Sequence, residues 1–330
     1  MKIEQSRLVF NSIHLFSIPH NFSFVQQPFQ PMQSLKYVYL FVIIHFSILS
    51  KAQTMNFEIQ GHRGCRGLMP ENTIPAFKKA IDLGVQTLEL DVIISKDKKV
   101  VVSHEPYFNP DISTAPDGKL VTKETAGNLH EMTYAEIKKY DVGLRGNKNF
   151  VEQQKMAIYK PLLKDMIAEA EKYAKAQGKA PLKYNIEIKS EEKEYGISQP
   201  EVAEFSDLVH AIISKMLKPE RVTLQSFDFN VLKFWHQQIL AGKYKKVSLA
   251  VLIEPLDNND INHNIEKLGF KPDIWSPYFA QLNEKRVSEL HQLGIRVIPW
   301  TVNKLEDMKI VKKIGCDGLI TDYPNRVKDL

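Results

Sequence analysis

The sequence is poor in cysteine and lacks the short motifs of several common enzyme classes. Only Cys65 and Cys316 occur in 330 residues, which is too few for a disulfide framework, and neither has the spacing of a zinc site. Cys65 follows the first predicted strand and Cys316 precedes the last, so we expect two unpaired thiols at opposite ends of the sheet. There is also no glycine-rich phosphate loop, no G-x-S-x-G elbow and no H-E-x-x-H helix.

An excess of charge of one sign is absent as well. The chain has a formal net charge of +5 and is 43% hydrophobic and 25% charged, which is ordinary for a globular protein. Residues 1–52 account for +3 of that charge, which leaves only +2 for the remainder. We therefore predict that neither a nucleic acid nor a charged membrane surface is a partner.

One long hydrophobic run is present, Tyr37–Leu49, which follows Lys36 and is interrupted only by His45 and Ser47. The run is short for a bilayer span, which needs about 20 residues, and it fits the core of a secretory signal peptide. The small residues in Ser50–Ala52 have the spacing of a signal-peptidase site. The pattern therefore predicts a cleaved leader.

We expect the mature chain to begin near Gln53 and to be periplasmic or secreted, with no stable membrane anchor after cleavage. Met32 stands just before the signal and is the predicted true start, so that residues 1–31 are an upstream extension. The alternative is that 37–49 stays attached and anchors the protein to a membrane.

After residue 53, short apolar runs alternate with helical patterns, which is typical of a parallel sheet with crossover helices. The predicted strands are 57–61, 86–92, 99–104, 183–189, 221–226, 247–252, 273–276, 295–301 and 317–321. The predicted helices are 73–83, 161–177, 199–217, 228–240, 259–267, 283–293 and 304–314, and four are closely followed by a glycine: Gly84, Gly178, Gly294 and Gly315. Residues 53–330 are thus predicted to form one (β/α)8 TIM-type barrel, which usually has about 250 residues.

Nine strands are one too many for this barrel. Between the second and the third lies only Ser95–Lys98, which is too short for a crossover helix and suits a turn. We therefore predict that 86–104 is an antiparallel hairpin whose second arm extends above the barrel mouth. A turn centred near 97–98 would bring Asp91 opposite His104.

Residues 105–160 follow this hairpin as an inserted segment. They are rich in Pro, Gly, Asn and Asp, and they contain one predicted helical stretch, near 133–140. A loop of this length in a compact domain is usually a lid, a small module or disorder. Because the segment leaves from His104, at the predicted active-site end, we favour a lid or a side wall over a surface excursion without a role.

Acidic side chains recur at the predicted strand ends, where β/α barrels carry their chemistry. Glu89 and Asp91 are two apart on one strand, so both carboxylates point the same way, and Glu187 lies near the end of the strand after the insert. Three converging carboxylates would repel each other without a cation, and oxygen ligands alone favour Mg²⁺ or Ca²⁺ over Zn²⁺. The alternative is that one or more of these acids form structural ion pairs with Arg63 or Lys189.

Two histidines and two cations complete the predicted site. His62 ends the first strand and His104 ends the returning arm, so they suit an acid/base pair that activates a nucleophile and protonates a leaving oxygen. Arg63 can clamp a phosphate with two hydrogen bonds, and Lys189 adds a point charge. Trp300, near the end of a later strand, fits either barrel packing or a wall against a substrate. These groups fit phosphodiester hydrolysis, where charge neutralisation and positioning carry most of the catalysis.

With these residues placed, the chain closely resembles the glycerophosphodiester phosphodiesterase family. The matching segments run in order from about residue 57 to 326: Gly61–Gly64, Pro70–Thr73, Glu89–Val92, Val102–His104, Asn185–Lys189, Gln225–Phe227, Trp300–Asn303 and Asp317–Pro324. Any one segment is weak evidence, whereas the ordered set is highly specific. One departure is visible, because the family usually has Asp directly after the second histidine and this chain has Glu105.

The resemblance implies a β/α barrel that hydrolyses glycerophosphodiesters to glycerol 3-phosphate and an alcohol such as choline or ethanolamine. It also implies one divalent cation, usually Mg²⁺ or Ca²⁺. Carried over onto this chain, the ligands would be Glu89, Asp91 and Glu187, the acid/base pair His62 and His104, and the phosphate-binding residues Arg63 and Lys189. It leaves open which histidine is the acid and which the base.

Two other functions fit part of this pattern. A barrel phosphodiesterase acting on intact lipid, resembling phosphatidylinositol-specific phospholipase C or sphingomyelinase D, would need an exposed apolar rim in 105–160. That segment carries Tyr107, Phe108, Tyr140 and Phe150, scattered among many charges. A non-catalytic barrel kept for phosphate binding would have lost a histidine or an acid, and here all are present.

Overall fold

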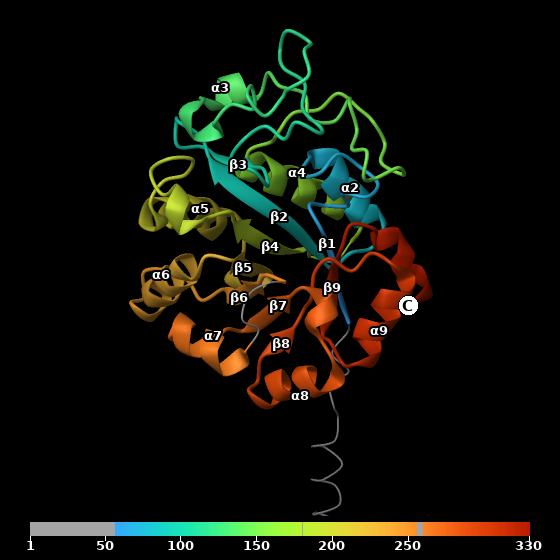
Figure 1. Cartoon of the computed structure of the whole chain (residues 1–330), viewed down its shortest axis with the longest axis vertical. Helices are drawn as coiled ribbons and strands as arrows, with labels where there is room; N and C mark the ends of the chain where they lie inside the picture. The colour runs from blue at the N-terminus through green and yellow to red at the C-terminus, as the bar shows by residue number, and fades with distance from the viewer. Residues whose placement is uncertain (1–56, 180, 256–259) are drawn as a thin grey trace, which may run out of the picture. The chain divides into compact units, whose positions relative to one another are not determined.

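Eight parallel strands follow one another around a barrel axis, with helices outside them (Figure 1). The computed structural model describes residues 57–179, 181–255 and 260–330, which all belong to one compact unit spanning 55–330. The barrel strands are β1 (Glu58–Gly61), β2 (Thr87–Ile94), β4 (Lys183–Ile188), β5 (Val222–Ser226), β6 (Ser248–Ile253), β7 (Ile274–Pro277), β8 (Arg296–Val297) and β9 (Gly318–Thr321). The backbone N–H of Asp317 donates to the carbonyl oxygen of Val297 at 2.9 Å, which joins β9 to β8. The predicted (β/α)8 barrel is confirmed.

Long helices cover the outside of the barrel between successive strands: α2 (Ile74–Asp82), α4 (Leu163–Ala176), α5 (Val202–Met216), α6 (Phe229–Leu240), α7 (Ile261–Leu268), α8 (Glu284–Gln292) and α9 (Leu305–Lys313). Each has an apolar stripe at helical spacing; α2, for example, buries Ala76, Phe77, Ala80 and Ile81. The four glycines predicted to follow helices all have positive φ angles. The predicted helix boundaries therefore agree with the structure to within a few residues.

The barrel interior has two unlike halves. Side chains from β1, β2, β4 and β5 form the polar half: Glu58, Gln60, Thr87, Glu89, Asp91, Asn185, Glu187 and Gln225, all buried. The opposite side, here called the apolar half, is a cluster from the segments of β6 to β9: Ala250, Ile274, Ile298 and Ile320. Alternate residues of the same strands, such as Leu88, Ile186 and Val251, pack in the larger core beneath the helices.

The strand β3 (Val100–Val102) pairs with β2 and runs antiparallel to it, so the predicted hairpin is confirmed. Its register is one residue away from the prediction. The N–H of Ser103 donates to the carbonyl oxygen of Asp91 at 3.0 Å, so Asp91 lies opposite Ser103 and not opposite His104. The reason is the turn: Ser95 pairs with Lys99 across three residues, which moves the centre of the hairpin to one side.

The insert 105–160 is a packed extension with a hydrophobic cluster of its own. It contains the 3₁₀ helix η1 (Leu129–Glu131) and the short helix α3 (Tyr134–Ile137), which overlaps the predicted helical stretch. Phe108 stacks on Tyr140 with ring centroids 3.8 Å apart, and the cluster includes Ile93 and Val101 of the hairpin. Near its far end, Nε2 of Gln153 donates to the carbonyl oxygen of Arg66 at 2.7 Å. This contact ties the insert to the loop that follows β1, and its role as a lid or a side wall stays a prediction.

Both cysteines are buried and unpaired, with Cys65 after β1 and Cys316 before β9, as predicted. Other predictions cannot be compared with the structure. The signal peptide, its cleavage after Ala52, the start at Met32 and the alternative anchor at 37–49 all lie outside the described residues. Within the described part of the chain, no helix is long and apolar enough to cross a membrane.

Candidate active site

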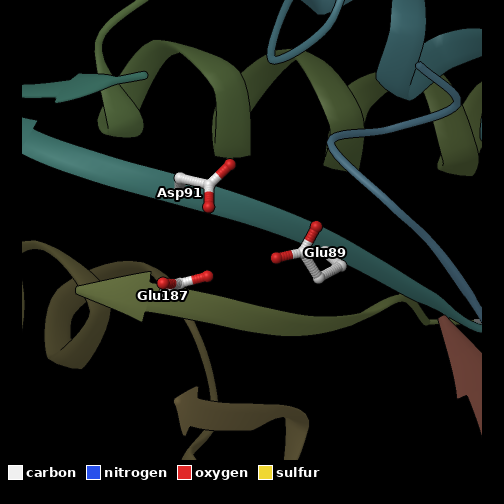
Figure 2. A group of neighbouring side chains, drawn as sticks. All are labelled: Glu89, Asp91 and Glu187. Carbon is white, nitrogen blue, oxygen red and sulfur yellow. The ribbon is translucent and has the colours of Figure 1, made fainter. Parts of the chain in front are cut away.

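Three carboxylates from two neighbouring strands converge in the polar half (Figure 2). Glu89 and Asp91 are two apart on β2 and so face the same way, and the parallel register places Glu187 of β4 beside Asp91. One ligand atom from each acid lies within 4.8 Å of the others, and all three side chains are buried. The structure thus brings together the three acids that the sequence predicts as metal ligands.

The charge and hydrogen bonding of this cluster fit a divalent cation. Burial, followed by the charges of Asp91 and Glu187, raises the pKa of Glu89 well above its usual range. Burial also raises the pKa of Glu187 to about 7, although Lys189 opposes the shift. The Oδ1 atom of Asp91 is buried and has no hydrogen-bond partner among the described residues. An unsatisfied carboxylate oxygen amid hard oxygen donors is what Mg²⁺ or Ca²⁺ would complete.

Asp91 is the most acidic member of the cluster. Burial by itself would raise its pKa, but the charges of His104, Arg63 and Lys189 hold the pKa well below its usual range. Nδ2 of Asn72 donates to Oδ2 of Asp91 at 2.8 Å, and Nε of Arg63 lies 3.4 Å from the same oxygen. Asp91 therefore keeps a negative charge at the centre of the site.

The turn after β1 is tight, and its two glycines make it possible. The N–H of Gly64 donates to the carbonyl oxygen of Gly61 at 3.1 Å, and a Cβ on Gly61 would lie 2.1 Å from the carbonyl oxygen of Gly64. Gly64 has a φ of +84°, and its own Cβ would meet the backbone of Ala76 at 2.7 Å. Between them, the N–H of Arg63 donates to Oε2 of Glu89 at 2.8 Å, which fixes the loop against the acidic cluster.

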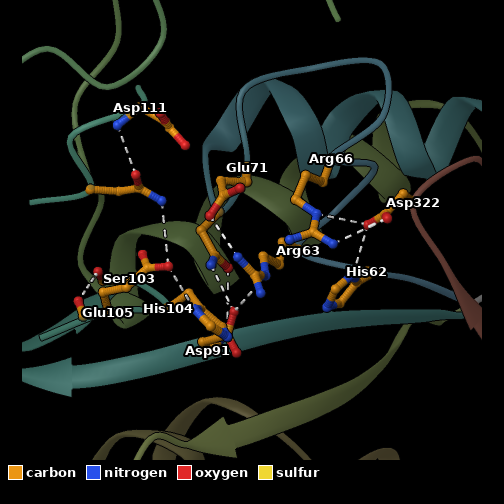
Figure 3. A network of polar contacts seen from close by, with 12 residues as sticks. His62, Arg63, Arg66, Glu71, Asp91, Ser103, His104, Glu105, Asp111 and Asp322 are labelled. Atoms are coloured by element: carbon orange, nitrogen blue, oxygen red, sulfur yellow. Dashed lines mark hydrogen bonds and ion pairs between the residues drawn. The ribbon is translucent and has the colours of Figure 1, made fainter. Parts of the chain in front are cut away.

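His62 is held from one side by a carboxylate (Figure 3). Nδ1 of His62 lies 2.6 Å from Oδ1 of Asp322, so this nitrogen donates and Nε2 is left for the cavity, 4.0 Å from Oε2 of Glu89. Asp322 also accepts from Arg66 at 2.9 and 3.1 Å and from Asn303 at 2.7 Å. Burial lowers the pKa of His62 to about 4, although the charge of Asp322 opposes the shift.

His104 is held in the same manner from the other side of the site. Its Nδ1 lies 2.9 Å from Oε1 of Glu105, the next residue in the chain. Burial, followed by the charge of Arg63, lowers the pKa of His104. Burial alone would raise the pKa of Glu105, but its contact with His104 and the charges of Arg63 and Lys160 lower that pKa to about 2. The glutamate that departs from the family pattern therefore still reaches its histidine as a carboxylate.

The two predicted phosphate-binding cations are both paired with acids. Nη1 of Arg63 donates to Oε1 of Glu71 at 2.7 Å, and Nζ of Lys189 lies 2.8 Å from Oε1 of Glu187. Burial by itself would lower the pKa of Arg63, but Glu71 and Asp91 raise it. The ion pairs named as the alternative for the acids are thus present, and they leave Glu89 without a lysine or arginine side-chain partner among the described residues.

A cavity of about 150 Å³ joins these groups at the barrel mouth. Its polar lining includes His62, Arg63, Arg66, Glu89, His104 and Glu187, and its apolar lining Phe227, Leu252, Trp300 and Ile320. Nε1 of Trp300 donates to the carbonyl oxygen of Ser276 at 2.9 Å, and the indole packs against the apolar half of the barrel. Trp300 therefore serves as barrel packing and also forms one wall of the cavity.

Several residues that support the predicted site received no role from the sequence. Asp322 holds His62, Asn72 donates to Asp91, and Nε2 of Gln225 donates to Oε1 of Glu89 at 2.8 Å. Gln225 lies near the end of β5 and Asp322 directly follows β9, so the rule that barrels carry chemistry at strand ends points to both positions but not to their partners. Asn72 lies in the segment Pro70–Thr73, which matches the family but gave no role for this side chain.

A family model, two related sequences and one solved structure all match this chain. The model of the glycerophosphoryl diester phosphodiesterase family matches residues 62–326. A glycerophosphodiester phosphodiesterase of Caldanaerobacter subterraneus is 28% identical over 272 residues, which cover 82% of this chain and 95% of that protein. The enzyme of that name from Bacillus subtilis is 26% identical over 275 residues, which cover 80% of this chain and 83% of that protein. The crystal structure of a candidate glycerophosphoryl diester phosphodiesterase from Silicibacter pomeroyi superimposes with a TM-score of 0.72 at 29% identity, covering 83% of this chain and 92% of that one.

Proposed function

The chain belongs to the glycerophosphoryl diester phosphodiesterase family and is a phosphoric diester hydrolase, and we propose that His62 and His104 carry out its reaction with the help of a cation. The substrate is a glycerophosphodiester, and the products are glycerol 3-phosphate and an alcohol. The observation that carries the proposal is the pairing of two histidines, each with a carboxylate on Nδ1, in one cavity with a buried three-acid cluster.

The histidines move protons at the two oxygens that exchange on phosphorus. With Nδ1 of each ring occupied by Asp322 or Glu105, Nε2 is the atom left for the substrate. One ring takes the proton of the attacking oxygen as that oxygen bonds to phosphorus. The other ring gives a proton to the alcohol oxygen as its bond to phosphorus breaks. The carboxylates keep both rings oriented for this exchange.

The acidic cluster is the proposed cation site. Glu89, Asp91 and Glu187 would hold one Mg²⁺ or Ca²⁺, which when bound supplies positive charge against the phosphate oxygens. Arg63 adds its charge from the cavity wall and Lys189 from beside Glu187, and both support phosphate binding. Trp300 lines the same cavity and would contact an apolar part of the substrate.

The test is the release of glycerol 3-phosphate from glycerophosphocholine by the purified protein. We expect product to disappear when EDTA is added and to return when Mg²⁺ or Ca²⁺ is restored. Product that persists in EDTA would contradict the cation site while leaving the hydrolase intact. No product with any cation would contradict the substrate, and lipid phosphodiesters would then be tested.

The leader is a separate proposal. The run 37–49 fits a secretory signal, so we propose that the protein is periplasmic or secreted and begins at Gln53. Intact-mass measurement of the exported protein should show Gln53 as the first residue. A mass that includes 37–49 would support the membrane anchor in its place.

A further inference from the structure

A row of buried polar side chains crosses the barrel interior to reach the acidic cluster. This polar row consists of Glu58, Gln60, Asn185, Gln225 and Glu89, each more than nine-tenths buried. Its first hydrogen bond, from Nε2 of Gln60 to Oε1 of Glu58, measures 3.0 Å, and the three that follow each measure 2.8 Å. The row therefore links the amino end of β1 to a predicted metal ligand on β2 without a break.

The first member determines the direction of the next hydrogen bond. Burial by itself would raise the pKa of Glu58, but hydrogen bonds from Thr87 and Arg296 lower it, so Glu58 is a carboxylate. A carboxylate accepts hydrogen bonds and donates none. Gln60 must therefore turn its NH₂ group toward Glu58 and its carbonyl oxygen toward Asn185.

Asn185 then has to donate on both sides. Its Nδ2 lies 2.8 Å from Oε1 of Gln60 and 2.8 Å from Oε1 of Gln225, while its own Oδ1 has no hydrogen-bond partner in the part of the chain that the structure describes. Because Gln225 accepts through its oxygen, its NH₂ group faces Oε1 of Glu89. The negative charge of Glu58 at one end of the row thus determines that Gln225 presents an N–H donor to Glu89 at the other end.

We propose that the polar row positions Glu89 for cation binding. Asn185 acts through Gln225: it sets the orientation of the Gln225 side-chain amide, which in turn donates to Glu89. The inference rests on the proposed cation site. Glu89 accepts from Gln225 through Oε1 and from the backbone N–H of Arg63 through Oε2, so two donors fix the plane of its carboxylate. Partners of metal ligands typically change metal affinity by roughly 10- to 100-fold when they are removed.

The test replaces the hydrogen-bond donor of Asn185 with an acceptor. Asn185→Asp has nearly the same shape but places an acceptor against two carbonyl oxygens, which favours a turned Gln225 that presents its oxygen to Glu89. We expect its dissociation constant for Ca²⁺, measured by isothermal titration calorimetry on the purified mature protein, to rise by roughly 10- to 100-fold. Gln225→Met, which keeps the side-chain length and removes the donor, should show a rise of the same kind and serves if the first variant does not fold.

Thr87→Val is the matched control. It removes a 2.6 Å hydrogen bond to Glu58 and so disturbs the base of the polar row, but Arg296 and Gln60 still donate to that carboxylate. We expect a lower melting temperature and an unchanged Ca²⁺ affinity. A loss of affinity as large as that of Asn185→Asp would show a general loss of rigidity and would overturn the proposal.

Two further outcomes separate this inference from the proposed function. If wild-type protein binds Ca²⁺, Glu187→Gln abolishes the binding, and folded Asn185→Asp and Gln225→Met bind like wild type, the positioning role is wrong and the cation site stands. If wild-type protein binds neither Ca²⁺ nor Mg²⁺, the cation site itself is wrong and the inference is overturned with it. Circular dichroism of each variant establishes that it is folded.

Discussion

The polar and apolar halves of the barrel interior share the same strand geometry but are filled in opposite ways. In both, alternate residues point inward, and the others pack under the helices. The polar half collects buried carboxylates, and the pKa values of Glu89 and Glu187 are raised. The apolar half buries Ala250, Ile274, Ile298 and Ile320. Burial of an isoleucine side chain contributes about 1.5–3 kcal/mol, so packing on one side helps to offset unfavourable electrostatics on the other.

Strand alternation therefore decides only which residues face the barrel axis. What those residues do depends on their chemistry and on which end of the barrel they occupy. At the amino end, Glu58 meets Thr87, Gln60 and Arg296 and has a lowered pKa. At the carboxyl end the acids meet one another. The polar groups at the amino end are satisfied within the protein, and the carboxyl end holds the proposed cation site.

Removing either histidine should have the largest effect. His62→Ala and His104→Ala should each reduce turnover by roughly 10²- to 10⁴-fold, because each removes a proton-transfer group while the barrel stays folded. Steady-state rates with glycerophosphocholine, together with circular dichroism, measure both quantities. His291→Ala is the control, since His291 pairs with Asp317 on the surface and should keep normal turnover. A histidine variant with near-normal turnover would contradict the acid/base assignment.

Neutralising one acid of the cluster should act on the cation selectively. Glu187→Gln should raise the Ca²⁺ or Mg²⁺ concentration needed for half-maximal activity by at least roughly tenfold, because even indirect partners of metal ligands have effects of that size. Titration of activity with each cation measures it. Glu191→Gln changes an exposed glutamate that pairs with Lys193 and should leave the titration unchanged. An unchanged cation requirement in Glu187→Gln would remove Glu187 from the ligand set.

A cavity in the apolar half should affect stability and leave the chemistry intact. Ile274→Ala should lower the free energy of unfolding by about 2–5 kcal/mol, because the barrel interior can collapse only partly around the lost side chain. Urea denaturation measures this, and turnover per folded molecule should stay near wild type. Ile310 is 55% exposed, so Ile310→Ala should change stability little. Turnover that falls as in His62→Ala would contradict the division between the two halves.

The smallest expected effect comes from the satisfied end of the polar half, and it depends on pH. Folding lowers the pKa of Glu58, so its ionised form contributes stability above the pH at which it titrates in the unfolded chain, near 4.3, and loses that contribution as the pH falls through the folded pKa. Glu58→Gln should therefore be less stable than wild type by roughly 1–3 kcal/mol at pH 7.

Denaturation curves of wild type and Glu58→Gln between pH 7 and pH 3 test this sign. The difference between the two proteins should shrink as the pH falls, because wild type also becomes neutral at this position. A difference that stays constant or widens in acid would contradict the lowered pKa of Glu58.

The fold was largely predictable because its signals are local. Strand and helix periods and capping glycines each depend on a few consecutive residues, and the predicted elements match the structure closely. The exceptions have local causes that the pattern hides. The predicted strand 295–301 shrinks to Arg296–Val297. Ile298 and Trp300 still donate to β7, but Pro277 of β7 has no N–H to donate in return. The hairpin register shifts by one residue because its turn is one residue different from the prediction.

The sequence predicts the site residues that lie at strand ends, but not the partners that hold them. Glu89, Asp91 and Glu187 follow from alternation, which needs no knowledge of distant contacts. The partner of His62 does not, since Asp322 is 260 residues away and only barrel closure brings the two together. The phosphate-binding roles of Arg63 and Lys189, together with the catalytic roles of the histidines, stay predictions that the proposed experiments test.

The contact between His62 and Asp322 ties the first barrel segment to the last. On the ribosome, the first histidine emerges long before the carboxylate that orients it, because Asp322 follows the last barrel strand. Until then the ring has no partner on Nδ1, and the barrel has no closing strand. We expect the nascent enzyme to be inactive until β9 and Asp322 have been made, so that turnover also reports that the barrel has closed.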